Sequence, residues 1–391
     1  MKILRSTHTV NPALGGPIES IKQSSAALLR RGHQVEIISL DGPDDPWVRD
    51  APVPVHALGP GLGGYGYSSR FSRWIKERRA EYDAVIVHGV WQYSSFGVWR
   101  ALAGTATPYF VFPHGMLDPW FKRTYPLKHV KKLLYWPWGE YRVLRDAAAV
   151  LFTSEEERRL ARESFSLYRC NEAVVNYGTA APPASENTRE SFLQVFPDLR
   201  GERFFLFLGR LHEKKGCDLL IRAYAQLRMD SDTTVPRHLV LAGPCADAEY
   251  LRHLQELAAT TTKNNGSITF PGMLTGDVKW GAFSAAEAFV LPSHQENFGI
   301  AVVEALASGT PVLISNKINI WREIEADGAG YVENDDLAGT ANLLRHWLAT
   351  PEAARSGMRE NAKKSFANRF EIERATDSLL AVIGNPGGPQ P

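Results

Sequence analysis

Residues 288–312 read AFVLPSHQENFGIAVVEALASGTPV. The apolar run at residues 288–292 predicts a buried strand that opens into a polar loop. From about Gly299 the apolar residues recur at helical spacing, and Gly309 is expected to end that helix. This strand–loop–helix order places Glu296 at the carboxyl end of a strand, where open α/β sheets bind ligands.

A second carboxylate, Glu304, lies one to two turns into the predicted helix, on a face that can point back toward the loop. Its neighbours are apolar, and an unpartnered charge among them would be costly. Carboxylates accept hydrogen bonds from hydroxyl-rich ligands such as ribose and hexose. The amides of Asn297, Phe298 and Gly299 open the helix, and amides at that position suit anions.

Short apolar runs alternate with helical patterns nearly throughout the 391 residues. This alternation predicts parallel sheets with right-handed crossovers, and two such series imply two Rossmann-like α/β domains. The break is expected within residues 176–187, where glycine, prolines and serine cluster. The expected strands are 2–4, 34–40, 84–88, 109–113, 148–153, 204–208, 239–242, 267–270, 288–291 and 312–315.

The Glu296–x7–Glu304 spacing, with Phe298-Gly299 inside it and ALASGTPV after it, resembles the signature of retaining glycosyltransferases of family 4, group 1 type, as used in polysaccharide biosynthesis. The resemblance implies the GT-B fold, with two Rossmann-like domains whose parallel sheets face each other across a cleft. It implies an acceptor-binding domain over 1–178 and a nucleotide-sugar domain over 179–368. A helix at about 369–384 would pack back on the first domain, and 385–391 is a predicted flexible tail.

The strand at residues 204–208 runs into a basic loop, Gly209-Arg210-Leu211-His212-Glu213-Lys214-Lys215-Gly216. It resembles the family element in which an arginine and a lysine hold the diphosphate of the donor, which implies that role for Arg210 and Lys215 and donor binding at Gly209. Charge-assisted hydrogen bonds of this kind contribute about 1.5–3 kcal/mol each. No metal or other cofactor is therefore expected, and no Asp-x-Asp motif is present to hold one.

Further candidates follow other strands. Gly15 and Gly16 open the first helix and suit a donor phosphate; they do not form the G-x-G-x-x-G pattern of dinucleotide-binding proteins. The resemblance implies that His114 lies beside the transferred sugar and that Met273 and Leu274 frame the nucleobase. His88 and Asp118 are additional candidates on the acceptor side.

The composition argues against several classes of protein, including nucleic-acid binding, zinc-binding, secreted and membrane-spanning proteins. The net charge of +1 gives no basic footprint for nucleic acid. Three cysteines without a C-x-x-C pair suggest a reducing compartment and no structural zinc. No signal-peptide core and no membrane-spanning run is visible, so a cytoplasmic location is expected.

Residues 120–145 interleave seven aromatic residues with seven lysines and arginines against Glu140 and no other acid. This pattern suits the surface of an anionic membrane, with a lipid-linked saccharide as acceptor. It equally suits an ordinary amphipathic helix whose aromatic residues pack inward. Both interpretations stay open at this point.

The functional prediction is a retaining hexosyltransferase that uses a UDP-sugar, with UDP-glucose first, to glycosylate a hydroxyl of a saccharide or lipid-linked saccharide. One alternative is a nucleotide-sugar epimerase of the same fold, which would act without an acceptor. Another is a sugar-nucleotide binding protein without turnover, which the complete set Arg210, Lys215, Glu296 and Glu304 disfavours.

Overall fold

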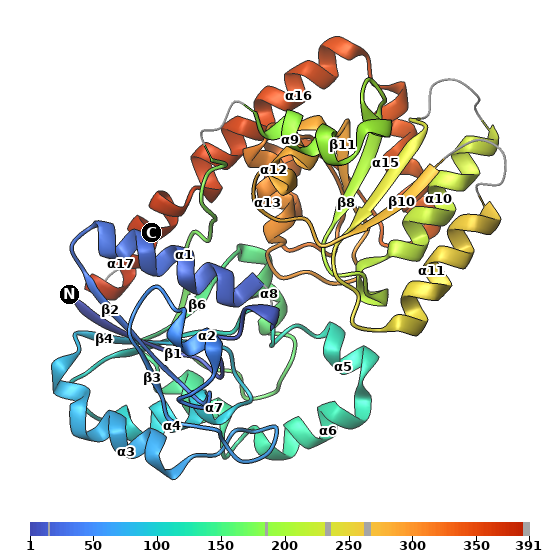
Figure 1. Ribbon diagram of the computed structural model, residues 1–391. Coiled ribbons are helices and arrows are strands. Elements are labelled where there is room, and N and C mark those ends of the chain that lie inside the picture. Colours follow the sequence, from blue (N-terminus) through green and yellow to red (C-terminus); the bar gives the residue numbers. More distant parts are fainter. Residues whose placement is uncertain (15, 184–186, 231–235, 262–266, 386–391) are drawn as a thin grey trace. The chain divides into compact units, whose positions relative to one another are not determined.

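The computed structural model describes residues 1–14, 16–183, 187–230, 236–261 and 267–385 (Figure 1). The chain divides into two compact units. Unit 1 comprises Met1–Thr179 and the chain from Ile372 onward, and unit 2 comprises Ala180–Glu371. Gly15 and residues 386–391 of the predicted tail lie outside the described residues.

Unit 1 contains a seven-stranded parallel sheet in the order β3-β2-β1-β4-β5-β6-β7. The order reverses direction at β1, so the carboxyl ends of β1 and β4 form a switch point of the kind that binds ligands in open sheets. The strands are β1 (Lys2–Ser6), β2 (Gln34–Ser39), β3 (Val55–Ala57), β4 (Ala84–His88), β5 (Tyr109–Phe112), β6 (Ala149–Phe152) and β7 (Glu172–Val174).

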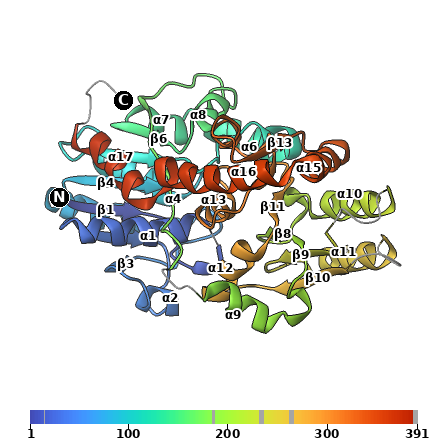
Figure 2. The same cartoon turned by 90° about the horizontal axis from the view of Figure 1, so that it is seen from above.

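The last helix of the chain belongs to unit 1. Helix α17 (Ile372–Gly384) lies against α1 (Gly16–Arg30), as Figures 1 and 2 show. Arg30 pairs with Glu373 at 2.6 Å, and the apolar side of α17 enters the core through Leu379 and Val382. The other helices of unit 1 are α2 (Pro46–Arg49), α3 (Ser69–Arg78), α4 (Tyr93–Leu102), α5 (Trp120–Thr124), α6 (Pro126–Tyr135), α7 (Glu140–Arg145) and α8 (Glu155–Ala161).

Unit 2 has a six-stranded parallel sheet in the order β10-β9-β8-β11-β12-β13, with its switch point between β8 and β11. The strands are β8 (Phe204–Leu208), β9 (His238–Ala242), β10 (Ser267–Gly272), β11 (Ala288–Leu291), β12 (Val312–Ser315) and β13 (Gly330–Glu333). The helices are α9 (Thr188–Val195), α10 (Cys217–Asp230), α11 (Ala248–Thr261), α12 (Gly276–Ala285), α13 (Ile300–Ala307), α14 (Trp321–Ala326), α15 (Leu337–Ala349) and α16 (Glu352–Ser365). Helices α10 and α15 pack on each other, as do α9 and α12 (Figure 2).

The predicted parallel α/β class is confirmed, and each of the ten expected strands is present within a few residues of its predicted bounds. Strands β3, β7 and β13 were not predicted. All three lie at sheet edges, and each is only three or four residues long with partly exposed side chains, so none has the apolar run that marks a central strand. No helix in the described ranges combines the length and the apolar character needed to cross a bilayer.

Candidate active site

The switch point of unit 2 holds an ion pair between Lys215 and Glu296. Lys215 ends a short 3-10 turn (Glu213–Lys215) after β8, and Glu296 follows β11, the neighbouring strand. Their side chains are 15% and 20% exposed. The two residues predicted to meet the diphosphate and the sugar therefore lie together at the carboxyl edge of the sheet.

Backbone contacts fix the two loops to each other. The carbonyl oxygen of Lys214 accepts hydrogen bonds from the His294 amide at 2.8 Å and from the Ser293 hydroxyl at 3.0 Å. Gly216 has φ +67°, and a Cβ atom at this position would lie 2.3 Å from the carbonyl oxygen of Pro292. Only glycine permits both the left-handed backbone and this close approach, so Gly216 brings the basic loop to Glu296.

Glu296 is held by its own backbone as well. Its amide donates to the Lys317 carbonyl, and its carbonyl accepts from the Asn319 amide, both at 3.0 Å. Gly299, with φ +75°, turns the chain from this loop into α13. The loop after β12 thus fixes Glu296 beside the amino end of α13.

Glu304 is buried on α13, with 6% of its surface exposed, and its Oε1 lies 2.7 Å from the Lys279 ammonium on α12. The burial excludes a solvated helix glutamate. The Lys279 contact supplies the opposite charge that a buried carboxylate needs. A ribose that reaches Glu304 would bind a carboxylate whose position Lys279 already fixes.

Three cations gather on the loop after β8, at Arg210, Lys214 and Lys215. Burial lowers the pKa of Lys215, and the positive charges of Lys214 and Arg210 lower it further. The paired carboxylate of Glu296 opposes that loss of charge. Arg210 is exposed, and no carboxylate of the described residues lies within ion-pair distance of it, so its guanidinium is available to an anion.

The other residues predicted to bind the nucleotide-sugar donor lie mostly with their backbone, and not their side chains, at the site. Gly209 donates its amide to Ala242 at 2.9 Å, and Phe298 is buried against Phe370 with ring centroids 5.8 Å apart. After β10, Met273 is 68% exposed while Leu274 is 8% exposed. Met273 is thus the side chain of that pair that a ligand can reach.

His114 follows β5 in unit 1 and has φ +50°, a strained conformation for a residue with a side chain. Its Nε2 atom lies 3.0 Å from Nδ1 of His88, and the edge of Tyr177 packs against its ring at 5.8 Å. His88 is 6% exposed, so it does not face the surface and instead contacts His114 from the interior of unit 1. Gly16 begins α1 after β1, which is two strands from β5 in the sheet.

Arg5 determines which histidine of this pair donates the hydrogen bond and which accepts it. It is 1% exposed, and its Nη1 atom lies 3.5 Å from Nε2 of His88. A guanidinium only donates hydrogen bonds, so Nε2 of His88 is the acceptor and its Nδ1–H donates to His114. His114 consequently carries its proton on Nδ1.

Burial and the Arg5 charge lower the pKa of His114 to about 4, and the pKa of His88 is also lowered by burial, Arg5 and His114. His114 is therefore neutral at pH 7. Its loop is anchored by Glu157, whose buried carboxylate accepts the Gly115 amide at 2.6 Å and the Thr153 amide at 2.7 Å. Asp118, 9% exposed, accepts the Trp120 amide at 2.8 Å, two residues before α5 begins.

Each unit matches one family model. Residues 15–178 match the glycosyl transferase 4-like domain, and residues 189–365 match the glycosyl transferases group 1. The chain belongs to the group 1 glycosyltransferases of family 4.

Relatives of this group 1 glycosyltransferase carry glycosyltransferase names. It is 28% identical over 249 residues to the D-inositol 3-phosphate glycosyltransferase of Geodermatophilus obscurus, covering 62% of this chain and 54% of that protein. It therefore spans about half the length of that relative. It is 25% identical to the alpha-monoglucosyldiacylglycerol synthase of Streptococcus pneumoniae, covering 98% of this chain and 87% of that protein.

Solved structures share the GT-B fold of this glycosyltransferase. Sucrose-phosphate synthase from Thermosynechococcus elongatus superposes with a TM-score of 0.77 at 21% identity, covering 97% of this chain and 98% of that one. Anabaena HepE in complex with UDP and glucose gives 0.77 at 18% identity, covering 98% and 99%.

Two buried residues near the His114 loop of this glycosyltransferase, Arg5 and Glu157, were not predicted as site residues. The sequence does mark Arg5 as unusual, because it is a charged residue inside the otherwise apolar first strand. Glu157 gave a second signal, because Ser154-Glu155-Glu156-Glu157 has the Ser-x-x-Glu spacing of a helix start, in which the glutamate turns back toward the chain before the helix.

Proposed function

We propose that this group 1 glycosyltransferase transfers a hexose, with glucose first, from a UDP-sugar to a hydroxyl of a saccharide or lipid-linked saccharide, with retention at the anomeric carbon. The Lys215–Glu296 pair at the switch point of unit 2 carries this proposal. HepE, bound to UDP and glucose in its structure, and the alpha-monoglucosyldiacylglycerol synthase support the donor and the lipid-linked acceptor.

Donor binding exchanges the partners of this pair. The diphosphate brings negative charge to Lys215 and Arg210, and the hexose brings hydroxyl donors to Glu296. The ion pair is therefore replaced by two sets of charge-assisted hydrogen bonds. As the bond from the sugar to the diphosphate breaks, negative charge builds on the phosphate oxygens, where fixed cations stabilise it.

The acceptor hydroxyl attacks the anomeric carbon on the face that the diphosphate leaves, and a diphosphate oxygen takes the hydroxyl proton. The products are the glycoside and UDP. Neutral His114, with its proton on Nδ1, acts as a hydrogen-bond partner of the sugar and not as an acid. Glu304 binds the ribose.

The direct test incubates the purified chain with UDP-glucose and a panel of saccharide and lipid-linked acceptors, with product detection by mass spectrometry. A new α-linked product from the α-linked donor, seen by NMR, supports the proposal. A β-linkage would overturn retention. A new UDP-sugar without acceptor would support the epimerase, and binding without any product would support the sugar-nucleotide binding protein.

Activity is expected to survive chelation, because Arg210 and Lys215 neutralise the departing diphosphate. EDTA should leave most of the initial rate intact. Loss of activity with EDTA and its return with Mg2+ or Mn2+ would contradict this expectation.

Arg5 is expected to keep His114 neutral. In Arg5→Met the pKa of His114 should rise from about 4, but only part of the way to its ordinary value, because burial, the larger of the two causes, remains. A histidine is neutral only above its pKa, so the variant should lose activity at a higher pH than the wild type does as the pH is lowered. The acid limb of the pH–rate profile should therefore shift to higher pH in Arg5→Met and return toward the wild-type position in Arg5→Lys. Unchanged imidazole 15N shifts in Arg5→Met would refute this role.

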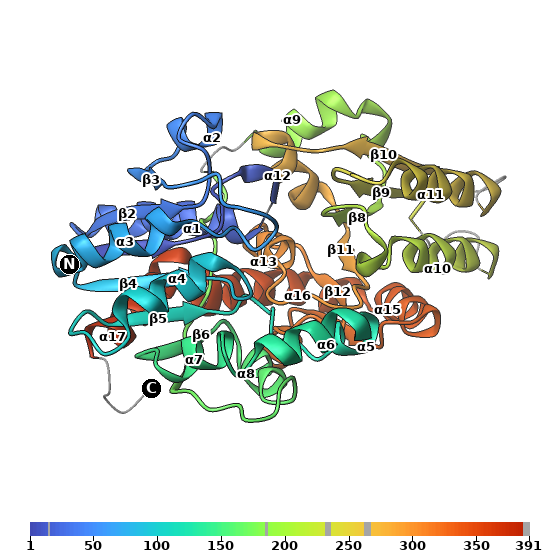
Figure 3. The same cartoon turned by 90° about the horizontal axis from the view of Figure 1, so that it is seen from below.

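We also propose that unit 1 binds anionic membranes through α6. Its outward face carries Leu127, Val130 and Leu134, which are 81%, 53% and 73% exposed, with Lys131 beside them. Figure 3 shows α5 and α6 following one another in unit 1. Exposed apolar side chains next to lysines fit a bilayer surface, where apolar burial adds to about 1 kcal/mol per basic residue.

Sedimentation with phosphatidylglycerol vesicles tests this surface. The wild type should pellet at low salt and should be released by high salt. The joint change of Lys128, Lys131 and Lys132 to glutamate should keep the protein in the supernatant, and Leu127→Ser with Leu134→Ser should weaken pelleting while leaving its salt dependence. A wild type that stays in the supernatant at low salt would refute membrane binding and favour a soluble acceptor.

A further inference from the structure

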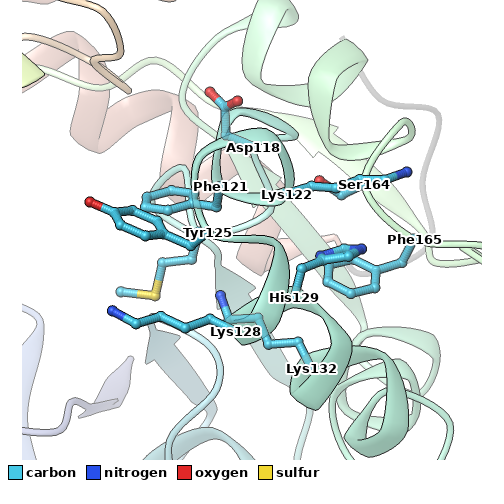
Figure 4. A pocket seen from close by; sticks show the side chains of 10 residues that line it. Asp118, Phe121, Lys122, Tyr125, Lys128, His129, Lys132, Ser164 and Phe165 are labelled. Atoms are coloured by element: carbon cyan, nitrogen blue, oxygen red, sulfur yellow. The ribbon is translucent and has the colours of Figure 1, made fainter.

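A pocket lies in unit 1 where the chain leaves β5 and passes through α5 into α6 (Figure 4). Phe121 and Tyr125 stand on one side of it, and His129 and Phe165 lie against each other on the other side, with ring centroids 4.9 Å apart. Lys122, Lys128 and Lys132 also line it. The pocket therefore combines aromatic walls with three ammonium groups, next to the loop that holds His114.

The three lysines have no carboxylate of the described residues within ion-pair distance. Asp118, the acid that lines the pocket, already accepts the Trp120 amide at the start of α5. Glu140 attracts Lys132 from α7, but its carboxylate is buried and accepts the Trp91 amide and the Ser95 hydroxyl at 2.8 Å. None of the three lysines is thus held in an ion pair by a described carboxylate.

Lys132 is the most desolvated of the three. Its ammonium lies 4.5 Å from the centroid of the Trp91 ring and 5.6 Å from that of Phe121, while Lys128 lies 4.7 Å from that of Tyr125. Lys128 and Lys132 are one helical turn apart, so they repel each other on one face of α6. Burial, and then Lys128, lower the pKa of Lys132 to about 8 against the attraction of Glu140. An anion placed between them would relieve this repulsion.

We propose that this pocket binds a phosphate group of the acceptor, with Lys128 and Lys132 as its principal ligands and Lys122 as the third cation. The inference rests on the proposed transfer to an acceptor hydroxyl and specifies the acceptor chemistry: a phosphate ester with an apolar portion against Phe121 and Tyr125. A phosphate offers three strong acceptor oxygens and up to two negative charges, which matches several separate ammonium groups better than a planar carboxylate does.

Binding of inorganic phosphate and glycerol 3-phosphate, measured by calorimetry on the full chain at low salt, tests the site. Lys132→Met and Lys128→Met should each weaken binding about tenfold. Lys131→Met is the matched control, because Lys131 is on the same helix but does not line the pocket; it should bind as the wild type does. Equal weakening in the control, or no binding by the wild type, would overturn the proposal.

The pH dependence separates a direct role of Lys132 from a structural one. Lys132 loses its charge as the pH rises through about 8, so wild-type affinity should fall between pH 7 and pH 9. Burial raises the pKa of Glu140 to about 7, so the comparison uses the range above pH 8, where Glu140 is already charged. There the fall in Lys132→Met should be much smaller, since His129, whose pKa is lowered, is neutral. An unchanged pH slope in Lys132→Met would remove Lys132 from the site.

Vesicles distinguish the two sources of the phosphate. If the ester belongs to a lipid, Lys132→Met should lower pelleting with phosphatidic acid vesicles more than Lys131→Met does. If the ester belongs to a soluble saccharide, the two variants should pellet equally while only Lys132→Met loses glycerol 3-phosphate binding. UDP binding, measured in parallel, reports on the donor site alone, so failure of the phosphate site is distinguishable from failure of the proposed transferase.

Discussion

Replacing Lys215 by alanine is expected to lower kcat about 100-fold. The change removes the half-buried cation to which the proposed function assigns the departing diphosphate, and a charge-assisted bond of about 3 kcal/mol corresponds to roughly that factor in rate. It also leaves Glu296 without its partner at the switch point. The measurement is steady-state kinetics with UDP-glucose, in which kcat should fall more than KM rises.

Two further variants on the same loop give a comparison for the effect of Lys215→Ala. Arg210→Ala should cost less, about tenfold, because Arg210 is exposed and its bond to phosphate competes with water. Lys214→Ala removes a neighbouring charge on the same loop and keeps the contacts of Lys214 to Ser293 and His294, which use its backbone, so it should lower kcat less than Lys215→Ala does. Unchanged kinetics in both Lys215→Ala and Arg210→Ala would remove the diphosphate assignment.

Glu296→Ala is expected to lower transfer at least about 1,000-fold while UDP still binds. UDP carries no hexose and so makes no use of this carboxylate, and the variant frees Lys215 to meet the diphosphate. UDP affinity by calorimetry should therefore be equal to the wild-type value or tighter. Glu296→Gln, which keeps the shape but not the charge, should retain more activity than the alanine variant.

Loss of UDP binding in Glu296→Ala would give Glu296 a different role. The backbone of Glu296 is bonded to residues 317 and 319, so a thermal unfolding curve for each variant shows whether its loop is intact. A variant that melts like the wild type and no longer binds UDP would place Glu296 at the nucleotide.

The central strands and the donor loops were predictable from the sequence because they depend on local patterns. Strand β11 is a continuous apolar run, and the glycines of the loops around it mark tight turns that few other residues allow. Strands β3, β7 and β13 were not predictable in this way, since a short edge strand is recognised only once its neighbour is in place.

The candidate site likewise has some contacts that the sequence could predict and others that it could not. The pairing of Lys215 with Glu296 could be anticipated, since both residues follow strands whose carboxyl ends share one edge. The contacts of Arg5 with His88 and of Glu157 with the His114 loop could not, because they join residues from different strands and helices whose relative positions only the folded unit defines. The chemical roles of all the predicted site residues, Met273 and Gly16 included, stay predictions.

Helix α17 has a consequence for the order in which this protein is made. Its apolar residues complete a core whose first strand begins at Lys2, so that core closes only after residues near 384 have left the ribosome. Unit 2 is continuous in sequence and can reach its native contacts while α1 still lacks its partner. During that interval the side of α1 that α17 covers is exposed, so a core that includes β1 is closed by a helix that follows all of unit 2.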